Sequence, residues 1–396
     1  MNIKIILLLT FIINLPFLTF SQKNFTENII LDGETFNPIS SVNIFNSKDN
    51  TISNEDGKFI FYSDIDTIII SHIGYEKVKT NFNNLKRKDT IFLNQQNIVL
   101  NEVEIKNRES FIKKVYGKVN YNFPFFEYGE KSFLRCIVKK NGEIIKFQDI
   151  LLDIGRNSLF TNPKIKTISY DIRILNLRKA GIIPKSKKVE DFELLSFNNL
   201  LKWYSAIFTN PKNYHYYEEK LMDSNYVKIN FSKKMSFKST KSIEGYYIID
   251  KKNLAFHKVH YNTIFENISE IPYKEKKNVK WKTIANELSV SFKKSRKNNK
   301  FYINNAKLKN VVEVIKNNEK TVYEATYEIL TTQNFISKSV ISNFSSNKNL
   351  FKTKFTYNED FWKNQNQLLL NDKLFKFINS LDKLKNEYDV YSNFSE

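Results

Sequence analysis

The sequence has 396 residues, enough for two or three domains at about 150 residues each. Its hydrophobic content of 41% and aromatic content of 15% exclude a wholly disordered chain. The formal net charge is +20, but the lysine runs at 274–282 and 293–300 lie within or beside alternating, strand-like segments. The charge therefore predicts a solvated surface, with attraction to anionic lipid headgroups or lipopolysaccharide as a second interpretation.

The first residues predict export. Ile5–Phe20 is apolar apart from three residues, and Thr19-Phe-Ser21 offers small residues where a signal peptidase cleaves. A membrane anchor is the alternative, but the run is short for a span of about 20 residues and Pro16 interrupts it. We expect a signal peptide at residues 1–21 and a mature chain in the periplasm or associated with the outer membrane. No nucleic acid is expected as a partner there.

Short strands separated by turns follow. Ile29–Leu31 is apolar, Val42 to Ile44 alternates, and Asn54–Gly57 is a turn in which glycine can adopt positive φ. Phe59 and Phe61 then alternate with Lys58, Ile60 and Tyr62, and Thr67–Ile70 is continuous enough for a strand covered on both faces. This spacing predicts a small β-sandwich.

Three motifs and a trailing segment in this region resemble a known module: Pro38-Ile39 before Val42-Asn-Ile44, Asn54-x-x-Gly57 before Phe59, Ser71-His-Ile-Gly-Tyr75, and Leu100–Ile105. The module is the carboxypeptidase-regulatory-like domain of Bacteroidota envelope proteins. The resemblance implies a seven-stranded, transthyretin-like sandwich at residues 22–105. It implies no activity, because the module accompanies peptidases, receptors and uncharacterised proteins alike.

Residues 106–396 are predicted to form a second, larger domain, which resembles the uncharacterised β-rich partners of that module. A helix is expected near 110–120, and Asn141-Gly142 predicts a hairpin between strands at 132–139 and 143–154. Residues 157–188 are expected to be loops with short strands. A helix is predicted at 191–208, apolar around much of its circumference.

From residue 226 the pattern is almost entirely that of antiparallel strands. They are expected at 243–250, 254–263, 279–292, 307–316, 321–331 and 337–344. A meander of this kind predicts a mainly β domain, either an open barrel or a curved sheet. A helix is expected at 372–388, capped by Asn371 or Asp372. The helices either fill the apolar concave face of the sheet or leave a groove for an acyl chain or a partner's apolar segment.

Known catalytic signatures are missing from the sequence. Four histidines are dispersed, and His257 and His260 lie at an odd offset that places them on opposite faces of a strand unless a bulge intervenes. Cys136 is expected to be a small buried strand residue. Asp149 with Asp153, and Glu324 with Glu328, share strand faces as a glycosidase pair would, although solvated strand faces often carry such pairs.

The sequence therefore assigns no catalytic, cofactor-binding or metal-binding residue and no cofactor. We expect a non-enzymatic cell-envelope protein with a binding or scaffold role, whose β-rich domain holds a lipid, a glycan or a protein partner, and peripheral membrane association is compatible with this role. The alternative is a hydrolase of unrecognised family that acts on envelope polymers. A TonB-dependent receptor is excluded, because fewer than 300 residues remain after the first module.

Overall fold

The computed structural model describes residues 24–95, 109–160, 170–185, 193–221, 225–236, 238–276, 278–335, 340–363 and 365–393. The predicted signal peptide and the predicted boundary between residues 105 and 106 lie outside these ranges. Among the described residues, no helix has both the length and the apolar character needed to cross a membrane.

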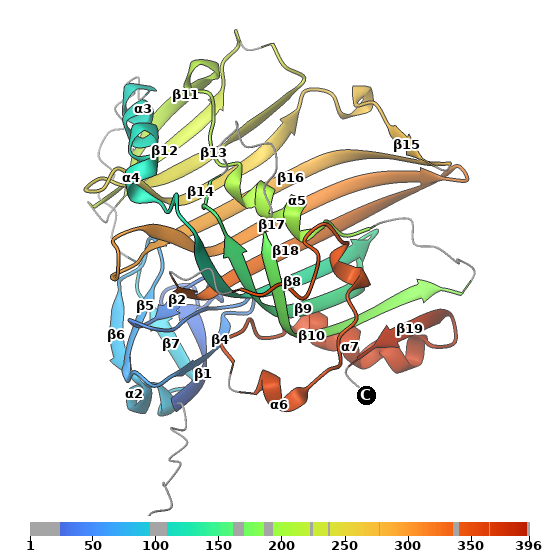
Figure 1. Cartoon of the computed structure of the whole chain (residues 1–396), viewed down its shortest axis with the longest axis horizontal. Coiled ribbons are helices and arrows are strands. Elements are labelled where there is room, and N and C mark those ends of the chain that lie inside the picture. The colour runs from blue at the N-terminus through green and yellow to red at the C-terminus, as the bar shows by residue number, and fades with distance from the viewer. Residues whose placement is uncertain are drawn as a thin grey trace, which may run out of the picture.

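The N-terminal part is a sandwich of two small sheets (Figure 1). One sheet has the order β4-β1-β7 and the other β3-β2-β5-β6, so the expectation of seven strands is confirmed. The strands are β1 (Asn24–Asp32), β2 (Asn43–Phe45), β3 (Asn50–Ile52), β4 (Lys58–Ser63), β5 (Thr67–Ser71), β6 (Val78–Asn81) and β7 (Thr90–Leu93). Strand β5 buries alternate residues, Ile68 and Ile70, so the expectation that both its faces are covered is wrong. The short helix α2 (Phe82–Lys86) adds Phe82 and Leu85 to the core.

The turn at Asn54–Gly57 forms as predicted. The Asn54 side-chain oxygen accepts hydrogen bonds from the backbone N–H groups of Asp56 and Lys58. Gly57 has a φ of 73°, and a Cβ atom there would lie 2.4 Å from the carbonyl oxygen of Ile30. Only glycine satisfies both conditions, so the turn is fixed in shape.

The second part is built on one open antiparallel sheet of twelve strands. Its order is β11-β12-β13-β14-β16-β17-β18-β8-β9-β10-β19, with β15 paired to β16 (Figure 1). The strands are β8 (Tyr128–Lys140), β9 (Glu143–Arg156), β10 (Asp171–Pro184), β11 (Tyr214–Lys220), β12 (Tyr226–Lys233), β13 (Lys241–Asp250), β14 (Ala255–Phe265), β15 (Lys274–Lys276), β16 (Val279–Lys294), β17 (Phe301–Lys316), β18 (Glu319–Phe335) and β19 (Tyr388–Ser392). The mainly β class is confirmed, as an open sheet and not a barrel.

Two strand expectations are wrong. The region predicted as loops, 157–188, contains the 14-residue strand β10, which continues the sheet beyond β9. Its polar and apolar residues alternate less clearly because both of its faces are largely covered. Conversely, residues 340–344 of the strand predicted at 337–344 form only an isolated bridge between Phe344 and Ile172. The β8–β9 hairpin is confirmed, with positive φ at both Asn141 and Gly142.

Helices are few in the described second part. They are α3 (Glu109–Gly117), α4 (Val119–Asn122), α5 (Phe197–Ser205), α6 (Glu359–Trp362), α7 (Asp372–Leu384) and the 3-10 turns η1 (Pro211–Asn213), η2 (Ile268–Glu270) and η3 (Leu350–Lys352). The helix predicted at 191–208 begins only at Phe197, because the Ser196 side chain caps it. The helix predicted at 372–388 is capped by Asn371 as expected but ends at Leu384, since Tyr388 already pairs in β19.

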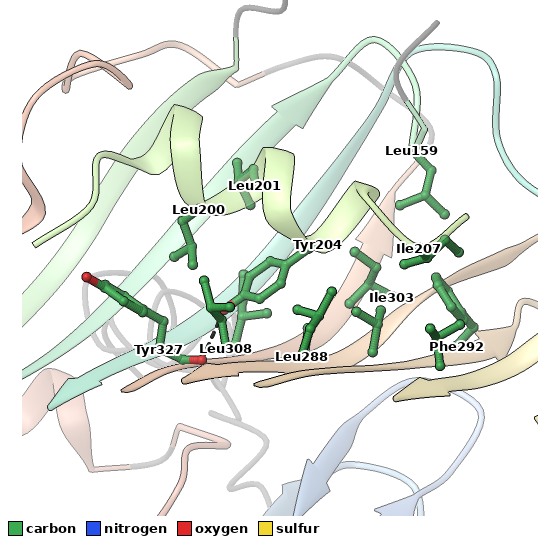
Figure 2. Close-up of a cluster of buried hydrophobic side chains, with 14 of the residues drawn as sticks. Leu159, Leu200, Leu201, Tyr204, Ile207, Leu288, Phe292, Ile303, Leu308 and Tyr327 are labelled. Carbon is green, nitrogen blue, oxygen red and sulfur yellow. Dashed lines mark hydrogen bonds between the residues drawn. The ribbon is translucent and has the colours of Figure 1, made fainter. Parts of the chain in front are cut away.

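Helix α5 covers the apolar face of the sheet. Figure 2 shows Leu200 and Tyr204 directed onto the side chains of Leu288 and other strand residues beneath them. The Tyr204 hydroxyl donates a hydrogen bond of 3.1 Å to the carbonyl oxygen of Tyr327. This face is therefore an ordinary core where α5 lies, the first of the two outcomes expected for it.

The other face of the sheet carries the sandwich and α7. Successive strand residues point to opposite faces, and Phe133, Leu151 and Leu330 pack with Ile52 of the sandwich and with Trp362. Helix α7 packs its buried face on a separate patch of the same side. The sandwich, α7 and the underlying strands thus meet at one junction (Figure 1).

Candidate ligand-binding cleft

A cavity of about 380 Å³ lies at the junction between the sandwich, the large sheet and α7. We call it the junction cleft. Its floor consists of side chains from β8, β9, β16, β17 and β18, while the Asn54–Gly57 turn and the start of α7 form its walls. Most of the residues that line it are polar or charged. The lining includes five basic side chains and four acidic ones: Arg135, Lys139, Lys307, Lys309 and Lys373 with Glu55, Glu287, Glu324 and Glu328.

Strand register places charges of opposite sign side by side on the floor. Lys307 of β17 lies opposite Glu328 of β18, which lies opposite Arg135 of β8. Arg135 in turn lies opposite Asp149 of β9, and Asp149 opposite Arg178 of β10. Cross-strand neighbours are about 5 Å apart, so the five side chains form a row of alternating charge across five strands.

The inner end of this row is buried and fully paired. Arg135 donates two hydrogen bonds of 2.8 Å to the two oxygens of Asp149. Arg178 donates two more, of 2.9 and 2.7 Å, and stacks 4.5 Å from the Trp362 ring centroid. The remaining donors of Arg135 reach the carbonyl oxygens of Leu368 and Leu369. These groups support the floor of the cleft, and most of their donors are used within the protein.

Glu328 and Glu324 differ in environment although both line the cleft. Burial raises the pKa of Glu328 above its usual range, against the opposing charges of Lys307 and Arg135. No hydrogen bond or salt bridge of Glu328 occurs among the described residues. Burial also acts on Glu324, but hydrogen bonds from Lys309 and Lys139 outweigh it and lower the pKa of that carboxyl. The two neighbouring acids are therefore shifted in opposite directions.

These shifts predict opposite pH effects on stability. The pKa of Glu328 is raised on folding, so its stabilising contribution is greatest below the ordinary pKa of glutamate and is lost as the pH rises through the raised value. Glu328→Gln should therefore gain stability relative to the unaltered protein as the pH rises above the ordinary pKa of glutamate, about 4.3. Glu324→Gln is the matched control: its pKa is lowered, so this variant should lose stability relative to the unaltered protein as the pH rises from the lowered value to the ordinary pKa of glutamate, and should stay level above it. Urea unfolding at several pH values measures both, and a parallel response of the two variants would contradict this assignment.

The walls of the cleft are held together by contacts between the sandwich and α7. The Asp56 carboxylate accepts a hydrogen bond from the backbone N–H of Asp372, at the first turn of α7. Glu55 accepts one of 3.1 Å from the Asn371 amide and forms a salt bridge of 3.2 Å with Lys307. The cleft therefore depends on the docked position of the sandwich.

The remaining residues singled out from the sequence lie elsewhere. Cys136 is buried in β8 as expected, and burial raises the pKa of its thiol. A bulge does occur at His257, but its ring contacts Tyr226 while that of His260 contacts Tyr246. Asp153 is half-buried away from the cleft. Within the described residues, no group of three or more histidine, cysteine or acidic residues is placed to hold a metal ion.

Sequence reasoning identified Glu324 and Glu328 but missed the basic residues that surround them. The available signal was polar residues at every second position of 307–309 and 324–328, with Arg135 and Lys139 on either side of Ile137. The order of strands, which brings these three segments together, could not be read from that alternation. A comparison of the chain with protein-family models and with characterised proteins gives no match.

Proposed function

We propose that this chain is a non-enzymatic cell-envelope protein that binds a polar segment of an envelope glycan or protein in the junction cleft. The observation that carries the proposal is the position and chemistry of this cavity. It lies between two structural units, and nine of its lining residues are charged. Binding sites occur preferentially in concave surfaces at such junctions. The predicted export places the protein where envelope polymers are available.

The lining favours a polar ligand over an acyl chain. Only four of the lining residues are aliphatic, namely Ile137, Ile144, Leu368 and Leu374. An acyl chain in this cleft would displace the water that hydrogen-bonds to the charged groups and would offer no hydrogen bonds in return. This desolvation is unfavourable. Glycan hydroxyls, peptide groups and anionic substituents can replace those hydrogen bonds.

A steric block of the cleft tests the proposal. Thr326 lines the cleft on β18, so Thr326→Trp should fill the space without changing charge. We expect the purified protein, without its predicted signal peptide, to bind at least one separated envelope fraction (sacculi, lipopolysaccharide or envelope proteins). Thr326→Trp should weaken that binding about tenfold or more, a loss of about 1.4 kcal/mol. Thr240→Trp, at an exposed position outside the cleft, is the control and should bind as the unaltered protein does. Retention of full affinity by a folded Thr326→Trp protein would contradict the proposal, as would a failure to bind any fraction.

Glu328 supports a second candidate, a hydrolase that acts on envelope polymers. A carboxyl whose pKa is raised by burial in a cleft can serve as a general acid. Glu324 is a poor partner for it in a glycosidase pair, because four residues along a strand separate the two backbone positions by roughly 13 Å, whereas the carboxyl groups of such pairs lie about 5–9.5 Å apart. If this candidate is correct, Glu328→Gln will abolish the release of soluble fragments from the bound fraction while leaving its binding intact.

A further inference from the structure

Two lysines in the junction cleft hold one carboxylate of the protein itself. Lys139 Nζ lies 3.1 Å from Glu324 Oε1, and Lys309 Nζ lies 2.8 Å from Glu324 Oε2. The lysines belong to β8 and β17, the strands on either side of β18, so they approach the carboxylate from opposite sides. The arrangement is a two-lysine clamp with a separate ammonium group for each oxygen.

The clamp carries more positive charge than it neutralises. Two ammonium groups face one carboxylate, and Lys373 of α7 lines the same cleft without a hydrogen bond or ion pair to any described residue. Across the cleft, the charges of Lys139 and Lys373 both act on Glu55, which already pairs with Lys307. Glu287 of β16 lies opposite Lys309 in register and offsets part of this charge, but three ammonium groups line the cleft beside the single Glu324 carboxylate, and they attract a second negative group.

Both clamp lysines can be reached by a ligand. Their side chains are 33% and 39% exposed, compared with 25% for Glu324. Each ammonium group has three N–H donors and uses one of them on Glu324. Each therefore retains donors for the acceptor atoms of a ligand. A ligand oxyanion can therefore bind the same two lysines either beside the Glu324 carboxylate or in its place.

We propose that Lys139 and Lys309 bind an oxyanion of the ligand, a carboxylate or a phosphate, in competition with the carboxylate of Glu324. The inference rests on the proposed function and specifies the chemistry of the group bound in the cleft. Glu324 is then the internal competitor that sets the affinity. Removing its charge frees both lysines, so Glu324→Gln should bind an anionic ligand more tightly than the unaltered protein does.

Calorimetric titration of the purified protein with short oligosaccharides tests the inference. The probes are trigalacturonate, its neutral methyl ester, and a glycerol phosphate trimer, so the carboxylate and phosphate sources are distinguished. We expect at least one anionic probe to bind about tenfold or more tightly than the neutral ester. Glu324→Gln should tighten that binding about tenfold, and Lys309→Gln should weaken it by a similar factor.

Glu219→Gln is the matched control. Glu219 of β11 lies outside the cleft and pairs with Lys228 of β12 at 2.8 Å. Replacing it with glutamine changes the net charge of the protein by the same amount as Glu324→Gln does. We expect no change in affinity. If Glu219→Gln and Glu324→Gln tighten binding equally, the effect is due to the overall charge of the protein and the inference is overturned. Equal affinity for trigalacturonate and its methyl ester would also overturn it.

The two proposals fail in distinguishable ways. If neither anionic probe binds while Thr326→Trp still abolishes retention on an envelope fraction, the oxyanion inference is wrong and the binding function stands. If Thr326→Trp has no effect and neither probe binds, both are wrong.

Discussion

Replacing Asp149 with alanine is expected to lower the free energy of unfolding by about 3–5 kcal/mol. The Asp149 side chain is fully buried and accepts hydrogen bonds from both Arg135 and Arg178. Without it, two guanidinium groups in a largely buried setting lose their shared counter-charge. Removing one partner of a buried ion pair is costly because the remaining charge stays desolvated.

Chemical denaturation followed by tryptophan fluorescence measures this effect. Asp360→Ala is the control, since Asp360 pairs with Lys363 on an exposed surface where such pairs contribute about 0–1 kcal/mol. A loss below about 1 kcal/mol for Asp149→Ala would show that the row of charges does not support the fold as described.

Leu200→Ala is expected to destabilise the protein by about 2–5 kcal/mol. Leu200 is fully buried beneath α5, where it contacts the apolar face of the sheet (Figure 2). Its truncation removes buried apolar surface and leaves a cavity between the helix and the strands. Lys202→Ala, at an exposed position of the same helix, controls for helix propensity and should change stability by less than about 0.5 kcal/mol.

The same variant tests whether the apolar face is core or a lipid groove. A core residue contributes to stability and not to lipid affinity. A small stability loss for Leu200→Ala, together with fatty-acid binding that this substitution weakens, would show that α5 covers a groove and would contradict the description of this face as core.

The sequence predicted those features that depend on local chemistry. The Asn141-Gly142 turn, the Asn54–Gly57 turn and the Asn371 cap all form, because each depends on residues next to one another in the chain. Alternating apolar residues likewise predicted most strands of the large sheet. Strand β10 escaped prediction because both its faces are largely covered, which weakens alternation.

The junction cleft could not be predicted, because it depends on contacts between distant segments. Glu55 and Lys307 are 252 residues apart in the chain, and their salt bridge forms only when the sandwich docks on the sheet. Strand order places β18 next to β8, although 178 residues separate Lys140 from Glu319 at the near ends of the two strands. Alternating polar residues in the sequence predict a solvated strand face, and the pattern is the same whether or not another structural unit covers that face.

Hydrogen–deuterium exchange tests the central claim most directly. The protein would be compared alone and with the envelope fraction that it binds most tightly. We predict slower exchange at 135–139, 307–309, 324–328 and the start of α7 near Asn371, the segments that line the junction cleft. Protection confined to β11 and β12 at the far edge of the sheet, with no change in the cleft segments, would contradict the account.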